Sequence, residues 1–419
     1  MTYTHRRLLA ATPALVATAL AAVILPAPPA AADDLQQCTF PGKMYEGRPW
    51  ALQRVLLDEL WKQSTGKGVR VAVIDTGVDV KNPQLAKAVD TGSGINLLPK
   101  KDDQGKELER GKEDGTTDTV GHGTKVAGII AARPAKGTGF VGLAPDATII
   151  PIQQNDAEGH GTAKTLAAAI RHAIAEKADV INISQDTANA VEPAPALKEA
   201  VDAALEKDIV VVASAGNDGL GGNVKRTYPA SYEGVLAVAA SDRNNERAQF
   251  SQSGDFVGIA APGVDMVSTV PGGGHCADNG TSFSAPYVAG LAALIKAKHK
   301  DWTRPQIVAQ IQQTAERSVA GHDRLVGWGV VDPVRALTED DKPIDKPVAH
   351  EGVTRNEAPT PAEVHLGETP EERNARLATY VVVGGGVLVA AISGGAVALR
   401  DARRRARRVS LQLQGREMA

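Results

Sequence analysis

Short runs of consecutive Val, Ile and Ala alternate with longer stretches of helical spacing through the middle of the chain, and this alternation constrains the fold most. Strands without polar positions are typical of parallel sheets that helices cover on both faces. The sequence therefore predicts an α/β fold with a mostly parallel sheet and helices on both of its faces. The predicted strands are 69–74, 147–152, 179–184, 209–213, 235–240 and 256–261, and the predicted helices are 123–132, 162–177, 195–207, 282–298 and 303–314.

The N-terminus has the features of a secretory signal peptide. Arg6 and Arg7 precede an apolar run over 8–25, and small residues follow up to Ala32. This order of a basic, an apolar and a small-residue region predicts cleavage after Ala32. A retained membrane helix is the alternative, but several prolines interrupt the run.

A second apolar run, over 379–399, carries no charged residue and is followed at once by an arginine-rich segment. A bilayer needs about 20 apolar residues, so this run predicts a transmembrane helix rather than a buried core helix. Basic residues stay on the cytoplasmic side of a membrane. The chain is therefore predicted to cross the cell membrane once, with its large domain outside the cytoplasm.

These segments divide the chain into six parts. The charged segment 98–120 within the folded domain is interpreted as a mobile surface loop. The Pro-, Glu- and Lys-rich stretch that follows the folded domain is interpreted as a flexible linker. The parts are a signal peptide (1–32), an N-terminal extension (33–65), a folded domain (66–338), a linker (339–376), the transmembrane helix (377–399) and a basic cytoplasmic tail (400–419).

The composition argues against some partners. The net charge of −3 gives no basic surface for nucleic acid, so no nucleic-acid partner is expected. The chain has 2 cysteines, too few for a disulfide framework, and their spacing does not indicate a metal site. No metal and no cofactor are predicted, because no cluster of ligand residues is convincing, including one for calcium.

Two motifs suit the acid–base part of an acyl-transfer site, in which a carboxylate orients an imidazole that activates a hydroxyl. Asp75 directly follows a predicted buried strand, and His122 lies in the Gly-His-Gly-Thr motif 121–124 that opens a helix. The positive end of the helix dipole is expected to disfavour the imidazolium form of His122. A structural Asp that caps a turn is the alternative interpretation for Asp75.

The same four residues recur at 159–162, so His160 competes with His122 for the role of base. The small and apolar run after His122 suits a helix that is buried against the sheet. The helix after His160 has a charged face with Lys164 and Arg171. We therefore predict His122 as the base and His160 as a solvated residue or one at the rim of the cleft.

Ser282 is predicted as the nucleophile, although a Ser at the start of a helix is ordinarily an N-cap. Its catalytic interpretation depends on the accompanying motifs. Asn217 follows another buried strand and offers a side-chain amide that can stabilise an oxyanion. A turn Asn is the ordinary interpretation of that residue alone.

The order of Asp75, His122, Asn217 and Ser282, with the motifs DTG, GHGT, AGN and GTSFSAP, resembles the subtilisin-like serine peptidases over about 66–336. The resemblance implies a serine endopeptidase with an Asp-His-Ser triad and Asn217 as an oxyanion donor. It also places Ser184, Gly216 and His160 at the substrate cleft. Gln185 and Asp186 depart from the family pattern beside Ser184, which leaves the substrate specificity open.

The layout as a whole looks like the mycosins, which are membrane-anchored subtilases that accompany type VII secretion systems. The extension 33–65 is too short for a conventional prodomain, and we expect it to wrap the domain through Trp50, Leu52, Val55, Leu56 and Trp61. Thiols of exported proteins tend to oxidise. Cys38 and Cys276 would then form a disulfide beside the active site, with two unpaired cysteines as the alternative.

The implied function is proteolysis of protein or peptide substrates outside the membrane, in association with a type VII secretion system. The alternative is a structural, stabilising component of a membrane secretion complex, in which proteolysis is secondary. Small residues at every fourth position of the membrane helix, including Gly386 and Gly394, would allow a partner helix to approach closely. Ordinary use of small residues in an Ala-rich chain is the alternative. Membrane proteins of a secretion complex are the partners that the resemblance implies.

Overall fold

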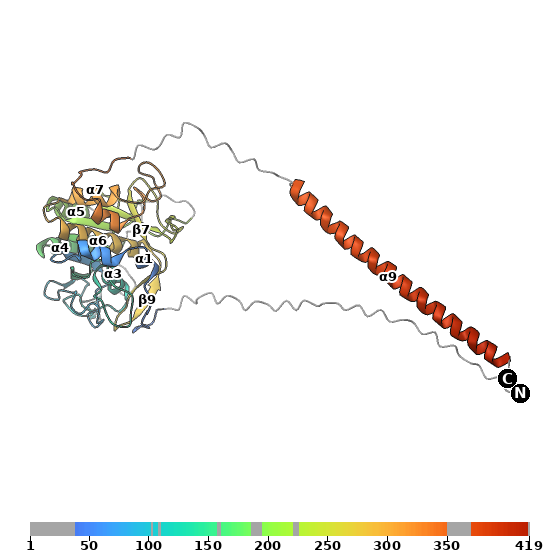
Figure 1. Cartoon of the computed structure of the whole chain (residues 1–419). Helices are drawn as coiled ribbons and strands as arrows, with labels where there is room; N and C mark the ends of the chain where they lie inside the picture. Colours follow the sequence, from blue (N-terminus) through green and yellow to red (C-terminus); the bar gives the residue numbers. More distant parts are fainter. Residues whose placement is uncertain are drawn as a thin grey trace. The chain divides into compact units, whose positions relative to one another are not determined.

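The computed structural model describes residues 38–101, 104–107, 110–156, 161–185, 195–220, 226–349 and 370–417, and side chains of the last range over 372–405. The predicted signal peptide lies outside the described residues. The chain divides into two compact units, Met1–Gly352 and Val353–Ala419. Figure 1 shows the first as a layered α/β body and the second as one long helix.

The first unit is built on a seven-stranded sheet in the order β2-β3-β1-β4-β5-β6-β7. Every neighbouring pair in it is parallel, which confirms the predicted fold class. The strands are β1 (Arg70–Asp75), β2 (Ile95–Asn96), β3 (Thr148–Gln153), β4 (Val180–Ile183), β5 (Val210–Ser214), β6 (Leu236–Ser241) and β7 (Val257–Pro262).

Side chains of β1 alternate between two buried clusters, one on each face of the sheet. Val71 and Val73 pack with α3 (His122–Ala131) and α6 (Thr281–Lys298). Ala72 and Ile74 pack with α4 (Ala163–Ala175) and α5 (Pro195–Glu206). The helices therefore cover both faces, as the runs of Val and Ile predict.

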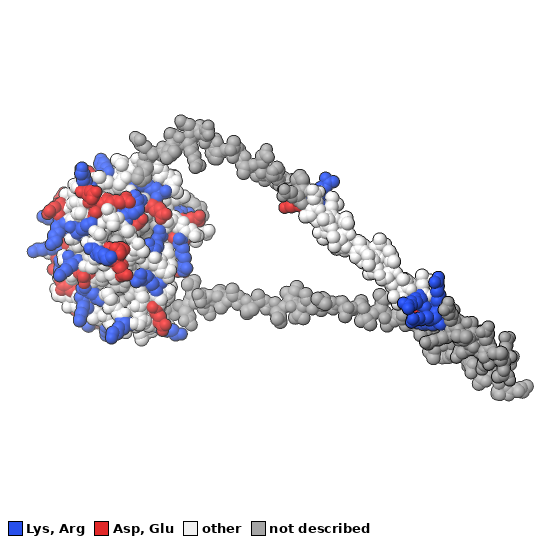
Figure 2. All heavy atoms as spheres, viewed as in Figure 1, with Lys and Arg blue, Asp and Glu red and all other residues white. Residues whose placement is uncertain are grey.

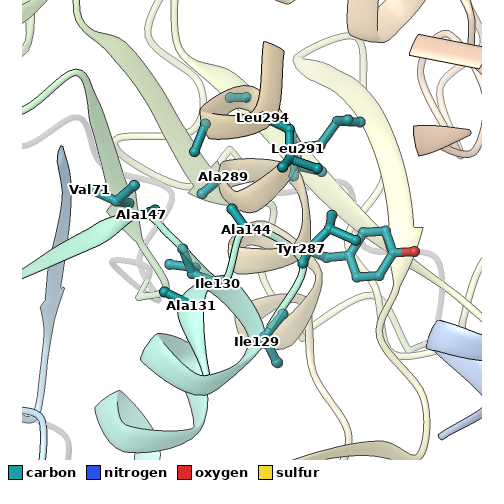
Figure 3. Packing of buried hydrophobic residues seen from close by; sticks show 14 of the residues in the cluster. Val71, Ile129, Ile130, Ala131, Ala144, Ala147, Tyr287, Ala289, Leu291 and Leu294 are labelled. Carbon is teal, nitrogen blue, oxygen red and sulfur yellow. The ribbon is translucent and has the colours of Figure 1, made fainter. Parts of the chain in front are cut away.

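Helix α6 is buried along most of its length, since every residue from Thr281 to Ile295 is shielded from solvent. It packs on α3 and on strands β4 to β7. Figure 3 shows side chains of α3, such as Ile130, beside those of α6, such as Ala289 and Leu291. Small residues on both helices permit this close packing, which positions the first turns of the two helices.

Several elements were not predicted from the sequence. An antiparallel hairpin of β8 (Met266–Thr269) and β9 (His275–Asp278) packs against α3. Helix α7 (Arg304–Gln313) was predicted from the sequence, but helix α8 (Pro333–Thr338), which follows it, was not. The extension also contains two short helices, α1 (Trp50–Gln53) and α2 (Leu57–Gln63).

The described part of the extension lies against the folded unit through both apolar and polar contacts. The indole N–H of Trp50 donates to the Val264 carbonyl at 2.9 Å, and that of Trp61 donates to the Leu143 carbonyl at 3.0 Å. Leu52 and Val55 are buried as expected.

Leu56 is not the anchor that the sequence suggested, because its side chain is 62% exposed. It stands at the N-cap of α2. The next turn of that helix instead buries Leu57 and Leu60.

Segment 98–120 is attached to the domain at several points rather than being a uniformly solvated loop. The guanidinium of Arg110 donates to the carbonyls of Asn96 and Leu98, and the Asn96 amide donates to the carbonyls of Arg110 and Lys112. Near its end, Asp118 is only 5% exposed.

The predicted linker 339–376 differs from the structure at both ends. Asp340 forms an ion pair with Lys298 and a hydrogen bond with His299, and these contacts hold the start of this stretch on the first unit. Helix α9 (Pro370–Glu417) begins before the predicted membrane segment and continues through the predicted tail, because charged helix formers flank the apolar run.

By length and composition, the stretch Glu372–Arg405 of α9 can cross a membrane. Figure 2 shows an uncharged middle in this helix, with a cluster of arginines after it. On the visible face of the first unit, acidic and basic side chains are interspersed. That mixed surface agrees with the nearly neutral net charge.

Candidate active site

Asp75 and His122 meet where the end of β1 faces the start of α3. The Asp75 carboxylate is fully buried, and its Oδ1 lies 2.7 Å from His122 Nδ1. The same oxygen accepts the backbone N–H of Thr76 at 2.8 Å. A side chain at Gly123 would come within 2.1 Å of the Gly77 carbonyl, so only glycine allows this approach.

Burial and the neighbouring charges together set the pKa of His122. Burial alone would lower the pKa of His122, but the Asp75 charge and hydrogen bond outweigh it and the pKa is raised. Asp118 adds a smaller contribution in the same direction, and Lys125 opposes it. The raised pKa differs from the expectation that the helix N-terminus would keep His122 neutral.

Ser282 occupies the first turn of α6, where its side chain is almost completely buried. The residue is 8% exposed. Gly280, not Ser282, is the N-cap of the helix, and this N-cap makes no side-chain capping hydrogen bond. The ring of the next residue, Phe283, lies 5.2 Å from the His122 ring between centroids. The structure thus brings the start of α6 beside the start of α3.

The side-chain amide of Asn217 is oriented by Thr281. Asn217 Oδ1 accepts the backbone N–H of Thr281 at 2.9 Å and its hydroxyl at 3.0 Å. A Cβ placed on Gly280 would lie 2.8 Å from Ser282 Oγ and 3.7 Å from Asn217 Nδ2. The hydroxyl and the amide N–H₂ therefore share the space beside Gly280, an arrangement that suits a nucleophile and an oxyanion donor.

Two of the three predicted cleft residues lie at the ends of neighbouring strands. Ser184 follows β4, and its hydroxyl accepts from the Asn182 amide at 2.8 Å. Gly216 follows β5 with φ 105°, and its N–H donates to the Thr281 hydroxyl at 3.2 Å. His160 and Asp186 lie outside the described residues.

A cleft of ≈ 890 Å³ opens between the extension and the β8–β9 hairpin. Lys125 lies at its wall, 5% exposed, with Nζ 2.8 Å from Asp278 Oδ2. Burial alone would lower the pKa of Lys125, but the Asp278 carboxylate raises it. Sequence reasoning missed this pair because the two residues are far apart in the chain and each is an ordinary surface type.

Cys38 and Cys276 line the same cleft as free thiols. Burial and a hydrogen bond to the Cys38 side chain raise the pKa of Cys276 to about 12, so Cys276 is a neutral thiol here. The two sulfur-bearing side chains are therefore neighbours. Among the residues that the structure describes, no group of three or more His, Cys, Asp or Glu side chains could hold a metal ion.

The sequence pattern of the subtilase family, Peptidase_S8, matches residues 66–329. The chain belongs to the subtilase family. It is 37% identical over 284 residues to Subtilisin Savinase of Lederbergia lenta, covering 68% of this chain and 96% of that protein. It is 36% identical over 285 residues to Subtilisin E of Bacillus subtilis (strain 168), covering 68% of this chain and 69% of that protein. This subtilase is therefore a serine endopeptidase.

Solved structures similar to this subtilase include mycosin proteases. The MycP3 protease from the type VII (ESX-3) secretion system has 35% sequence identity and a TM-score of 0.61, covering 72% of this chain and 90% of that one. MycP1 from Mycobacterium smegmatis has 32% identity and a TM-score of 0.62, covering 77% and 92%. These similarities confirm the predicted resemblance to the mycosins.

Proposed function

We propose that this subtilase cleaves proteins outside the cytoplasmic membrane with Asp75, His122 and Ser282 as its catalytic triad. The observation that carries the proposal is the 2.7 Å contact between Asp75 and His122 at the start of α3, next to the turn that holds Ser282. Serine peptidases need this combination of carboxylate, imidazole and hydroxyl.

In the proposed mechanism, Asp75 accepts the Nδ1–H of His122 and so directs Nε2 of the ring towards the reaction. His122 takes the proton of the Ser282 hydroxyl as Oγ attacks the peptide carbonyl, and it then protonates the leaving amine. Asn217 Nδ2 donates to the oxygen that becomes negative. The raised pKa of His122 means that activity should fall on the acidic side, where the ring is protonated and cannot act as a base.

The role of Asn217 can be measured separately from that of the triad. Asn217→Ala removes the amide donor and should lower kcat by about 10²–10³, since one donor typically contributes that much. It also leaves the Thr281 N–H and hydroxyl without their acceptor. Asn217→Asp restores an acceptor for Thr281 without restoring the donor, so a loss of kcat in both variants would assign the effect to the donor.

The apolar helix supports a membrane location. The stretch Glu372–Arg405 would cross the bilayer once, with the arginines that follow its apolar run in the cytoplasm and the peptidase unit outside. We propose the six parts that the sequence indicates, with the membrane helix within α9 and the start of the linker held on the first unit by Asp340. The signal peptide, cleaved after Ala32, would deliver the peptidase unit to that side.

An oxidising compartment would allow Cys38 and Cys276 to form a disulfide. The contact between their side chains supports this pairing, and the bridge would attach the extension to β9, whose end precedes Ser282 by a few residues. Peptide mapping of the exported protein with and without reductant tests it: a linked peptide pair is expected, and two free thiols would contradict the pairing.

Association with a type VII secretion system is proposed on the similarity to MycP1 and MycP3. The second candidate function is a scaffold of such a membrane complex, which the apolar and small-residue-rich middle of α9 favours. Gly386 and Gly394 lie on the proposed docking face, and their replacement by Leu should impair assembly if that face binds a partner.

Comparison of envelope and secreted proteins between wild type and Ser282→Ala separates the two functions. Ser282→Ala should preserve the fold and abolish substrate cleavage, so uncleaved substrates should accumulate. If secretion and all processing continue in this variant, the protein acts as a scaffold and the proposed proteolytic function fails. The variant protein must be present at the wild-type level for either result to count.

A further inference from the structure

Asp118 is a buried carboxylate just before His122 that the catalytic steps do not use. It is 5% exposed and belongs to the charged segment 98–120. Its Oδ1 accepts the backbone N–H of Gly121 at 2.7 Å and that of Val120 at 3.1 Å. Its Oδ2 accepts both the N–H and the hydroxyl of Thr124, at 2.9 and 2.6 Å. The carboxylate thus accepts hydrogen bonds from residues on both sides of His122 in the sequence.

A fifth donor, the hydroxyl of Thr76, connects Asp118 to the turn that carries Asp75. The Thr76 hydroxyl donates to Asp118 Oδ1 at 3.0 Å, and the same hydroxyl oxygen accepts the Gly123 N–H at 3.0 Å. Thr76 directly follows Asp75, and its own N–H donates to the Asp75 carboxylate. One chain of hydrogen bonds therefore runs from Asp118 through Thr76 to Asp75.

We propose that Asp118 is a positioning residue that holds the Asp75 and His122 turns in register and adds a buried negative charge beside His122. The proposal rests on the proposed function of Asp75, His122 and Ser282. Five donors point at its two oxygens, so the site suits an ionised carboxylate, which only accepts hydrogen bonds. A neutral side chain of the same shape would leave donors unmatched.

Three charged groups contribute to the field at His122. Asp75 contributes from β1, Asp118 from the turn before α3, and Lys125 from α3 itself, while α6 presents the uncharged ring of Phe283. Burial raises the pKa of Asp118 and its hydrogen bonds oppose that rise. Because Asp118 helps to raise the pKa of His122, loss of its charge should lower that pKa.

Asp118→Asn is the first test, on the full-length enzyme with a peptide substrate. We expect kcat to fall about 10- to 100-fold through misplacement of His122, with KM little changed. The acidic limb of the kcat/KM profile should move to lower pH. Asp332→Asn is the matched control, since Asp332 also accepts two backbone N–H groups, at the N-cap of α8. It should change neither kcat nor the acidic limb.

Thr76→Val and Thr76→Ser separate the positioning of the catalytic turns from the effect of the Asp118 charge on His122. Thr76→Val removes the hydroxyl bridge but keeps the Asp118 charge, so kcat should fall while the acidic limb stays in place. Thr76→Ser restores the hydroxyl and should recover most of kcat. This pair also carries the test if Asp118→Asn does not fold.

The proposal is overturned if folded Asp118→Asn keeps the wild-type kcat and acidic limb, or if Thr76→Val is as active as Thr76→Ser. These results differ from failure of the proposed function, in which Ser282→Ala would itself remain active.

Discussion

The two faces of the sheet are packed in different ways, and the difference explains where the site can form. On the face of α3 and α6, every residue of α6 from Thr281 to Ile295 is buried, and α3 packs against β8. On the face of α4 and α5, each helix buries one side and exposes the other, as the exposed Lys198–Asp202 pair on α5 shows. Only the first face determines the position of His122 and Ser282.

The most severe test of this contrast is Gly128→Val in α3. A Cβ at Gly128 would come within 2.1 Å of Thr269 Oγ1 and 2.5 Å of Ser268 Oγ. Those hydroxyls donate to the carbonyls of Thr124 and Lys125, so the clash would also break two buried hydrogen bonds. We expect a loss of more than about 3 kcal/mol in the free energy of unfolding.

Ala168→Val in α4 adds the same kind of side chain to the other face and serves as the control. Ala168 is only partly buried, so its loss should stay near about 0.5 kcal/mol. Denaturant unfolding of both variants provides the comparison. Equal losses would show that the two faces are packed alike.

Leu291→Ala and Leu205→Ala sharpen the contrast with deletions. Leu291 in α6 is fully buried, whereas Leu205 in α5 is half-buried. We expect about 2–5 kcal/mol for the first and less than about 2 kcal/mol for the second. Activity at a temperature where both variants are folded should also fall more in Leu291→Ala, because α6 carries Ser282. The reverse order in either measurement would contradict the account.

The extension adds a smaller, pH-dependent contribution on the face of α3. His275 Nδ1 accepts the Tyr45 N–H at 3.1 Å, and Nε2 lies 2.7 Å from the Gln84 side-chain oxygen, so the ring is neutral and buried. Burial lowers the pKa of His275 to about 4. The unfolded chain, with a His pKa of about 6.5, binds more protons between these values. Stability from this residue is therefore complete above about pH 6.5 and is lost as the pH falls towards 4.

Thermal unfolding of wild type and His275→Gln between pH 7 and 4 measures this effect. The wild type should lose at most about 3 kcal/mol from His275 across the window, and the variant should lack that part of the slope. Identical slopes would show that the His275 contact does not depend on its protonation state.

Patterns of neighbouring residues were enough to predict most of the fold. The amphipathic spacing of α4 and the apolar runs of the strands gave boundaries within one or two residues of the structure. Features that depend on distant contacts were missed: β8 and β9 pair through residues with mixed polarity. Leu56 has the same type as the buried Leu57, and only the start of α2 decides which one faces the core.

In the candidate site too, residues in local sequence motifs were predicted, and a residue whose role depends on the folded structure was missed. Asp75, His122, Asn217 and Ser282 stand in short motifs at the ends of strands and the starts of helices. In the structure Asp75 contacts His122, the side chains of Asn217 and Ser282 lie beside Gly280, and the ring of Phe283 lies next to His122. Asp118 could not be distinguished from the solvated acids around it, because its five donors come from the folded turns. The spacing of Asp118 before the Gly-His-Gly-Thr motif was the available signal.

Labelling with a fluorophosphonate probe tests the central claim most directly, because such probes phosphonylate an activated serine. Tryptic mapping of the labelled full-length protein should find the adduct on Ser282 alone. Labelling should disappear in Ser282→Ala and be strongly reduced in His122→Ala, with both variants folded. An adduct on another serine, or labelling that persists in Ser282→Ala, would contradict the assignment of Ser282 as the nucleophile.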